Sequence, residues 1–290
     1  MNGWILLDKP KGLSSAKAVG KVRHLFDRAK AGHGGTLDPL ASGLLPIALG
    51  EATKVIGYIL DGTKGYRATV VWGESRDTDD AEGAVTATSA ARPDRAAILA
   101  ALPAFSGPIV QRPPAYSALK VAGQRAYALA RAGETVVLKS REIEIFSLEL
   151  VEMDAEYAVL DVICSKGTYI RALVRDLAEA LGTVGYLGDL RRTRAGPFTE
   201  VQAISLACLE SLGHSARLAE ALWPLETALD DIPALALDGD AAARLRHGQS
   251  IDVSAGLRDG IVFATSDSGP VAMARATGGT LKPLRVFNSG

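Results

Sequence analysis

The sequence predicts an α+β fold built on a mixed, largely antiparallel sheet that is flanked by helices. Segments that alternate apolar and polar residues, as strands do, are interspersed with segments of helical periodicity. These segments follow no repeating strand–helix–strand order, which argues against a parallel α/β sheet. Hydrophobic residues make up 48% of the 290 residues and charged residues 22%, so the chain can bury the core of one large domain and a small one.

Four segments of the first part of the chain have the pattern of strands. Residues 4–7 are a short apolar run that Asp8-Lys9-Pro10-Lys11-Gly12 ends, which is typical of a buried strand followed by a turn. Residues 66–72 alternate between two faces, as a strand does. We expect two further strands near residues 142–153 and 156–164.

Helices are predicted where apolar residues recur at helical spacing. The first begins at Ser14 or Ser15, and either serine can cap it, because a serine side chain accepts a hydrogen bond from a free backbone N–H of the first turn. The other helices of this part are expected at residues 52–59, at 94–102 with Asp94 as its cap, and at 169–181.

A boundary between two domains is predicted at residues 230–240, where acidic residues are interspersed with a proline and a glycine. We therefore expect a large domain over residues 1–230 and a small β-rich C-terminal domain over residues 235–290. In the small domain, Gly-rich turns separate the expected elements, which are a helix at 241–247 and strands at 261–265, 271–276 and 284–287.

Residues 112–141 form a long basic excursion within the large domain. They hold six Lys and Arg residues against a single acid, Glu134, together with prolines and glycines. The formal net charge of the chain is only -1, but phosphate contacts require positive charge locally rather than overall. The segment is either a solvated loop or a clamp on a nucleic acid, and its excess of basic residues favours the clamp. Arg191, Arg192 and Arg194 form a second basic cluster.

The most distinctive stretch is the Gly-rich loop Gly32-His33-Gly34-Gly35-Thr36-Leu37-Asp38-Pro39-Leu40-Ala41-Ser42-Gly43. It lacks the Gly-x4-Gly-Lys-Ser/Thr spacing of a nucleoside triphosphate site. A lone acid in such a loop is usually a turn former. However, Pro39 restricts the conformation of Asp38, and a fixed carboxylate between apolar neighbours suits a nucleophile or a base. The residues of the loop alone leave both interpretations open.

Five segments together resemble the TruB family of pseudouridine synthases. They occur in the family's order and with family-like spacing between residues 7 and 193. The segments are an N-terminal Lys-Pro motif from Leu7 to Ser15, the loop that carries Asp38, the strand segment Lys64-Gly65-Tyr66-Arg67-Ala68, the signature Ser165-Lys166-Gly167-Thr168-Tyr169-Ile170-Arg171, and Leu187-Gly188-Asp189-Leu190-Arg191-Arg192-Thr193.

The resemblance implies a role for several residues of these segments. Asp38 is expected to be the catalytic carboxylate, and Arg171 is expected to pair with it and to hold it ionised. Tyr66, the third expected catalytic residue, would stack on the target base. Tyr169 and Leu190 would line the same pocket, although an ordinary core position is an equally good interpretation of Leu190.

Other residues are expected to bind the substrate. Asp80 resembles an acid that supports the arginine, and His33 resembles a residue that stacks into the space left by a flipped base. Basic residues that we expect to contact the RNA are Lys9, Lys120, Arg125 and Arg191.

The implied reaction converts a uridine in the T-arm loop of tRNA, at position 55, to pseudouridine. The base is flipped out of the folded loop, and its glycosidic bond is cleaved and re-formed. Because the reaction involves no redox change and no group donor, we expect neither a cofactor nor a metal. The C-terminal domain resembles a PUA-like RNA-binding module.

We expect a soluble, cytoplasmic monomer that acts on tRNA, needs no guide RNA and does not associate with a membrane. The sequence shows no apolar run long enough to span a membrane, and its N-terminus lacks a basic leader. Two alternatives are a guide-RNA-dependent pseudouridine synthase, which the compact length disfavours, and a non-catalytic tRNA-binding folding chaperone. The chaperone would need the basic segment but not the carboxylate of Asp38.

Overall fold

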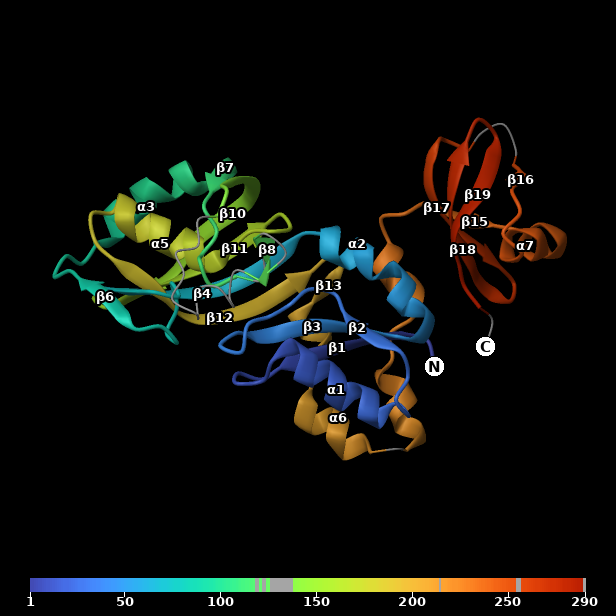
Figure 1. The fold of residues 1–290 in the computed structure, drawn as a ribbon, viewed down its shortest axis with the longest axis horizontal. Helices are drawn as coiled ribbons and strands as arrows, with labels where there is room; N and C mark the ends of the chain where they lie inside the picture. Colours follow the sequence, from blue (N-terminus) through green and yellow to red (C-terminus); the bar gives the residue numbers. More distant parts are fainter. Residues whose placement is uncertain (118–119, 122–123, 126–137, 214, 254–256, 289–290) are drawn as a thin grey trace.

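The computed structural model describes residues 1–117, 120–121, 124–125, 138–213, 215–253 and 257–288. The chain forms a ten-stranded sheet with helices packed on it, followed by a five-stranded sheet near the C-terminus (Figure 1). The predicted α+β class is therefore confirmed. None of the helices within the described ranges has the length and apolar character that a membrane crossing requires.

The large sheet joins segments from the whole first part of the chain. Its strands, from one edge to the other, are β14 (Ile204–Ser205), β1 (Gly3–Lys9), β3 (Ser42–Leu49), β12 (Gly185–Ala195), β4 (Lys64–Trp72), β11 (Tyr157–Cys164), β10 (Arg141–Met153) and β7 (Gly107–Gln111), with β2 (Ala31–His33) on β3 and β13 (Phe198–Thr199) on β12. Among the described pairs, β1–β14 and β3–β12 are parallel and the rest are antiparallel, as predicted.

The helices begin close to the predicted capping residues. Ser14 is the N-cap of the first helix, and its Oγ accepts a hydrogen bond from the backbone N–H of Lys17 at 3.3 Å. Asp94 likewise accepts one from the N–H of Ala97 at 2.8 Å. The helices are α1 (Ser15–Leu25), α2 (Ile56–Asp61), α3 (Arg95–Ala101), α5 (Ile170–Ala180), α6 (Leu206–Leu212) and α7 (Gly239–Arg246); the 3-10 helices are η1 (Gly50–Val55), η2 (Leu102–Phe105), η3 (Glu200–Gln202), η4 (Ala216–Ala221) and η5 (Leu225–Leu229).

The main core lies between the large sheet and its helices. In Figure 1, α1 and α6 lie together beside β1, while α3 and α5 lie at the other end of the sheet. Leu173, Val174 and Leu177 of α5 are almost fully buried in this core, and burial of each such side chain contributes about 1.5–3 kcal/mol. This packing also fixes Arg171 in the first turn of α5.

The sequence pattern does not predict two of the central strands, β3 and β12. Pro46 lies in the middle of β3, and prolines are uncommon within central strands. Gly185, Gly188 and a run of arginines hide the alternation of β12. Both strands form because neighbouring strands bury them, a tertiary effect that outweighs local propensity.

The β-rich C-terminal domain is present as predicted. Its strands are β15 (Ala234–Ala236), β17 (Gly260–Ser266), β18 (Gly269–Thr277), β19 (Thr280–Val286) and β16 (Ile251–Asp252), in this spatial order, and α7 packs against them. Trp4 and Phe198 of the large sheet share one buried cluster with Phe263, Met273 and Phe287 of this domain. Two short ladders complete the fold, β5 (Glu74–Arg76) with β6 (Val85–Thr88), and β8 (Lys120–Val121) with β9 (Gln124–Arg125).

Candidate active site

The loop between β2 and β3 carries Asp38. Leu37 is buried in the main core, whereas the side chain of Asp38 is 47% exposed. The loop therefore fixes one residue in the core and presents the next one to solvent. At its end, Gly43 has φ +93°, and a Cβ there would lie 2.4 Å from the carbonyl oxygen of Arg192, so glycine is required where β3 meets β12.

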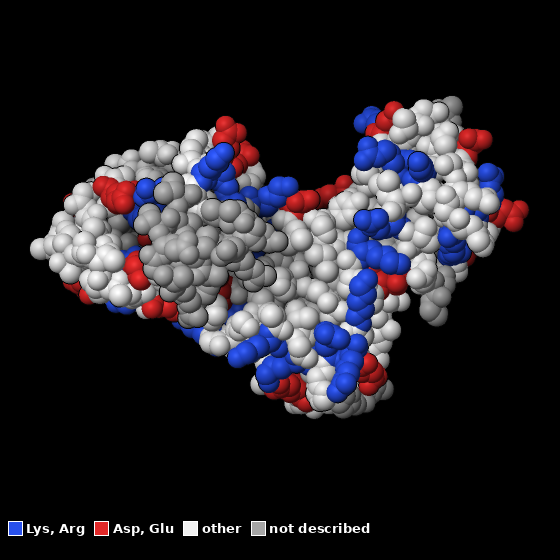
Figure 2. Space-filling model, in the orientation of Figure 1, with Lys and Arg blue, Asp and Glu red and all other residues white. Residues whose placement is uncertain are grey.

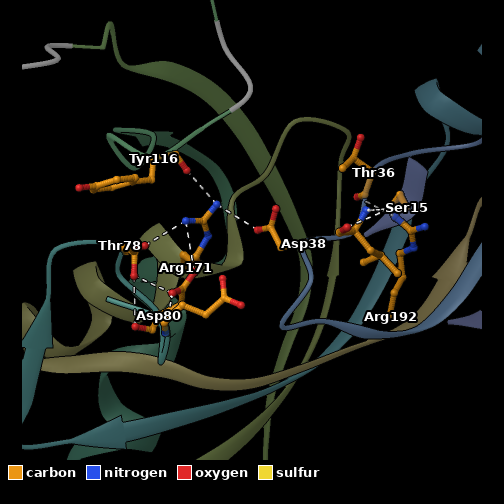
Figure 3. Close-up of polar contacts among 10 residues, drawn as sticks. Ser15, Thr36, Asp38, Thr78, Asp80, Tyr116, Arg171 and Arg192 are labelled. Carbon is orange, nitrogen blue, oxygen red and sulfur yellow. Dashed lines mark hydrogen bonds and ion pairs between the residues drawn. The ribbon is translucent and has the colours of Figure 1, made fainter. Parts of the chain in front are cut away.

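The guanidinium of Arg171 is the centre of the site (Figure 3). Its Nη2 lies 3.0 Å from Oδ2 of Asp38 and donates to the carbonyl of Tyr116 at 3.0 Å. Its Nη1 donates to the carbonyl of Thr78 at 3.0 Å and lies 3.4 Å from Oδ2 of Asp80. The side chain of Arg171 is only 9% exposed, so water screens these contacts little.

Asp80 lies on the opposite side of Arg171 from Asp38. Its side chain is 5% exposed, and its Oδ1 accepts hydrogen bonds from Thr78 Oγ1 at 2.6 Å and from the N–H of Glu82 at 3.0 Å. Both carboxylate oxygens thus have partners, which a buried acid requires. Arg171 is therefore held between a buried carboxylate and a half-exposed one.

Tyr66 lies on β4, between β11 and β12, and is half-buried. In the ladder it is opposite Arg192. Burial raises the pKa of the Tyr66 phenol, and the nearby Arg192 opposes that effect. The phenol consequently keeps its proton at neutral pH.

Tyr169 is positioned through its backbone, and the sequence gives no sign of this. Gln111, which is 1% exposed, accepts a hydrogen bond from the N–H of Tyr169 at 2.8 Å and donates one to its carbonyl at 3.0 Å. The guanidinium of Arg141 lies 4.6 Å from the centre of the Tyr169 ring. Gln111 ends a strand, β7, just where the sequence predicts the basic excursion, so periodicity could not reveal its role.

The position of Arg192 differs from that expected of a member of the second basic cluster. It is 1% exposed, and it donates to the carbonyls of Leu44 at 2.7 Å, Gly35 at 3.1 Å and Thr36 at 3.4 Å. Arg192 therefore binds the backbone of the loop that carries Asp38, not solvent. The alternation of faces along a strand predicts this buried position, because Arg192 follows Leu190 by two residues and therefore shares its inward face.

Two residues expected to contact RNA have other partners. Lys9 is fully buried, and its Nζ donates to the carbonyls of Leu13 at 2.7 Å and Pro10 at 3.0 Å; burial lowers its pKa to about 8. In this structure the ammonium of Lys9 therefore holds backbone carbonyls, and its contact with substrate stays a prediction. Arg191 is 35% exposed and forms ion pairs with Asp8 at 3.0 Å and Glu200 at 2.5 Å.

The remaining expected residues divide between core and site. His33 lies on β2, half-buried, and its Nδ1 has no hydrogen-bond partner in the described structure; burial lowers its pKa, so the ring is neutral at pH 7. Leu190 is 9% exposed and belongs to the main core. The backbones of Lys120 and Arg125 pair in a short ladder, but their side chains, and most of the expected clamp over 112–141, lie outside the described residues.

The fold and the site together describe a mixed-sheet α+β protein with a half-exposed carboxylate that is held by a buried guanidinium, an arrangement suited to an enzyme. Comparison with known proteins narrows this class. Residues 23–170 match the model described as TruB family pseudouridylate synthase (N terminal domain). Residues 171–230 match the model described as tRNA pseudouridylate synthase B C-terminal domain.

Curated relatives match over almost the whole chain. The tRNA pseudouridine synthase B of Bradyrhizobium diazoefficiens is 52% identical, over 99% of this chain and 86% of its own length. That of Caulobacter vibrioides is 51% identical, over 99% of this chain and 96% of its own length. The chain therefore belongs to the TruB family of pseudouridylate synthases, and it is an isomerase.

Solved structures agree with the fold. A structure of an H/ACA RNP bound to a substrate RNA containing 2'-deoxyuridine is similar with a TM-score of 0.76 and 27% identity, over 99% of this chain and 85% of that one. A Cbf5-Nop10-Gar1 complex is similar with a TM-score of 0.76 and 28% identity, over the same shares of both chains.

Proposed function

We propose that this protein converts a uridine in the T-arm loop of tRNA, at position 55, to pseudouridine, with Asp38 as the active carboxylate. The single observation that carries the proposal is the 3.0 Å contact between Arg171 and an Asp38 side chain that remains 47% exposed. A carboxylate in this position is oriented and yet open to a nucleotide. The curated relatives, which are tRNA pseudouridine synthases B, support tRNA as the substrate.

The reaction breaks the bond between N1 of the base and C1′ of the sugar and forms one between C5 and C1′. Atoms and electrons balance within the nucleotide, apart from a proton that leaves C5 and one that N1 gains. Asp38 can act by attacking the base, by attacking the sugar or by removing a sugar proton, and each of these needs an ionised, fixed carboxylate. Arg171 fixes the direction of this carboxylate through its 3.0 Å contact.

Extrusion of the uridine costs a few kcal/mol, which stacking and phosphate contacts must recover. Aromatic residues close to the site include Tyr66 on β4, Tyr169 at the N-cap of α5, and Tyr116, whose carbonyl accepts a hydrogen bond from Arg171 (Figure 3). His33 lies on the strand that enters the Asp38 loop. Despite the net charge of -1, Lys and Arg gather over the region of α1 and on the C-terminal domain in Figure 2. The exposed basic residues on or just after α1 are Lys17, Lys21, Arg23, Arg28 and Lys30.

We further propose that the protein acts as a monomer and needs no guide RNA. The similar H/ACA RNP structure makes guide dependence the competing proposal. Purified protein and an unmodified T-arm stem-loop, with no other RNA, separate the two. Conversion of the uridine supports the stand-alone enzyme, whereas conversion only after a guide RNA is added supports the alternative.

The variant Asp38→Asn tests the carboxylate. We expect its rate of pseudouridine formation to fall below about one thousandth of the wild-type rate, with tRNA affinity retained. The control is Asp27→Asn, an exposed aspartate with φ 47°, a conformation that asparagine tolerates. Full activity in Asp38→Asn would overturn the assignment. Binding without conversion by the wild type would instead favour a folding chaperone.

A further inference from the structure

The N-terminal Lys-Pro motif forms hydrogen bonds with Leu37 and Pro39, the residues immediately before and after Asp38. None of the motif's side chains was assigned a chemical step above. Ser15, which is 3% exposed, uses its hydroxyl twice on the residue before Asp38. Its Oγ accepts a hydrogen bond from the N–H of Leu37 at 2.8 Å and donates one to the carbonyl of Leu37 at 2.8 Å. Figure 3 shows Ser15 beside the loop and opposite the Arg171 side.

The residue after Asp38 is held by the same motif. The N–H of Gly12 donates to the carbonyl of Pro39 at 2.8 Å. Gly12 has φ +78°, which glycine adopts at low cost. The ammonium of Lys9 in turn fixes the motif itself, because it binds the carbonyls of Pro10 and Leu13. The motif thus holds the backbone of residues 37–39 through hydrogen bonds at Leu37 and Pro39.

We propose that Ser15 is a positioning residue that sets the direction of the Asp38 carboxylate through the peptide groups of Leu37. The proposal rests on the proposed function of Asp38. Among the described residues, the ion pairs and hydrogen bonds of the Asp38 side chain reach only Arg171, from one side, and the side chain is half-exposed. The backbone of the neighbouring residues is therefore a second constraint on its direction. A misplacement of about 1 Å at a reacting group lowers a rate about 100-fold.

Helix capping does not account for Ser15. The neighbouring Ser14 already caps α1, through its bond to the N–H of Lys17, whereas the Ser15 hydroxyl exchanges hydrogen bonds with the backbone of Leu37. The two serines are adjacent, chemically identical and differently used. They provide a matched pair for separating an effect on the helix from an effect on the site.

The experiment compares Ser15→Ala, Ser15→Thr and Ser14→Ala on an unmodified tRNA, by steady-state kinetics, by tRNA binding and by thermal unfolding. We expect Ser15→Ala to lower kcat about 10- to 100-fold with KM and tRNA affinity changed less than about 2-fold. Ser15→Thr, which keeps the hydroxyl, should recover most of kcat. Ser14→Ala should lower the unfolding temperature and leave kcat within about 2-fold of the wild type.

The proposal is overturned if kcat of Ser15→Ala stays within about 2-fold of the wild type, or if Ser14→Ala loses kcat equally. A rise in KM with unchanged kcat would also overturn it, since that outcome indicates a binding role. If Ser15→Ala does not fold, Ser15→Cys keeps the shape with weaker hydrogen bonds, and wild-type kcat in that variant counts against the proposal. Wild-type protein and Asp38→Asn are measured alongside, so a failure of the proposed function is seen separately as an inactive wild type.

Discussion

The two sides of the Asp38 loop use positive charge in different ways. On the α5 side, Arg171 is paired with the carboxylates of Asp38 and Asp80. On the sheet side, three buried cations donate to backbone carbonyls; these are Lys9, Lys64 and Arg192. Arg192 also interacts with the phenol of Tyr66, and no carboxylate of the described residues lies within ion-pair distance of the three cations. We call the first region the acid-paired side and the second the carbonyl-paired side.

This difference suggests that the cation of the acid-paired side serves catalysis, whereas the cations of the carbonyl-paired side stabilise the fold. A guanidinium that faces carboxylates fixes their direction, so its loss should affect catalysis most. A cation that faces carbonyls fixes the path of the backbone, so its loss should affect stability most, because buried carbonyls are left without donors. The following substitutions test this division, from the largest expected effect to the smallest.

Arg171→Met should lower the single-turnover rate about 1000-fold, which corresponds to about 4 kcal/mol. The substitution leaves Asp80 buried without its cation and removes the only described ion pair of Asp38. Arg175→Met is the control, because Arg175 lies one turn further along α5 and pairs with Asp79 and Asp176 instead. Equal losses of rate in both variants would mean that the acid-paired side acts through the helix and not through Asp38.

Arg192→Met should lower the free energy of unfolding by about 2–4 kcal/mol, because three carbonyls of the Asp38 loop and β3 lose their donor. Urea unfolding measures the change. Arg192→Lys keeps the charge but loses the forked geometry, so its loss should be intermediate. A wild-type stability in Arg192→Met, with a large loss of rate, would contradict the assignment of Arg192 to shape.

The buried lysines should make stability depend on pH. Burial lowers the pKa of Lys64 to about 8, from 10.5 in an unperturbed lysine. The unfolded chain therefore binds more protons between these pH values, and the free energy of unfolding rises as pH increases through that window. Lys64 should contribute about 1–3 kcal/mol of this rise. Denaturant unfolding from pH 7.5 to 9.5 should show a shallower slope in Lys64→Met and an unchanged slope in the exposed control Lys282→Met.

Arg191→Ala should have the smallest effect, less than about 1 kcal/mol of stability, since its ion pairs with Asp8 and Glu200 are partly exposed. We expect tRNA affinity within about 3-fold of the wild type, because these carboxylates already occupy the guanidinium. A loss of affinity greater than about 10-fold in a filter-binding assay would restore the expectation that Arg191 binds the substrate.

Local pattern predicted most helices and four strands of the large sheet, β1, β4, β10 and β11, and the family resemblance predicted which acid and arginine meet. The caps at Ser14 and Asp94 follow from side-chain chemistry within one turn, which a sequence displays directly. The approach of Arg171 to Asp38 joins residues far apart in the chain, and only the resemblance brought them together.

The carbonyl-paired side could not be predicted in the same way. The carbonyl partners of Lys9, Lys64 and Arg192 are backbone groups, which carry no residue identity and therefore leave no trace in the sequence. From the sequence, Lys9 and Arg192 suggested a surface for RNA, but both side chains are buried and bind the backbone. The alternation of faces along β12 could have placed Arg192 in the interior, but β12 was not itself predicted as a strand, so this pattern could not be used.

The first strand has hydrogen-bond partners of Trp4 that are synthesised late, near residue 225. The N–H and carbonyl of Trp4 pair with those of Trp223, and its indole N–H donates to the carbonyl of Leu225, 221 residues further on. At a ribosomal rate of about 5–20 residues per second, that partner emerges roughly 10–45 seconds after Trp4. The first strand of the nascent chain must therefore remain incompletely paired for most of translation, and this interval is when chaperone contact with the growing chain would matter most.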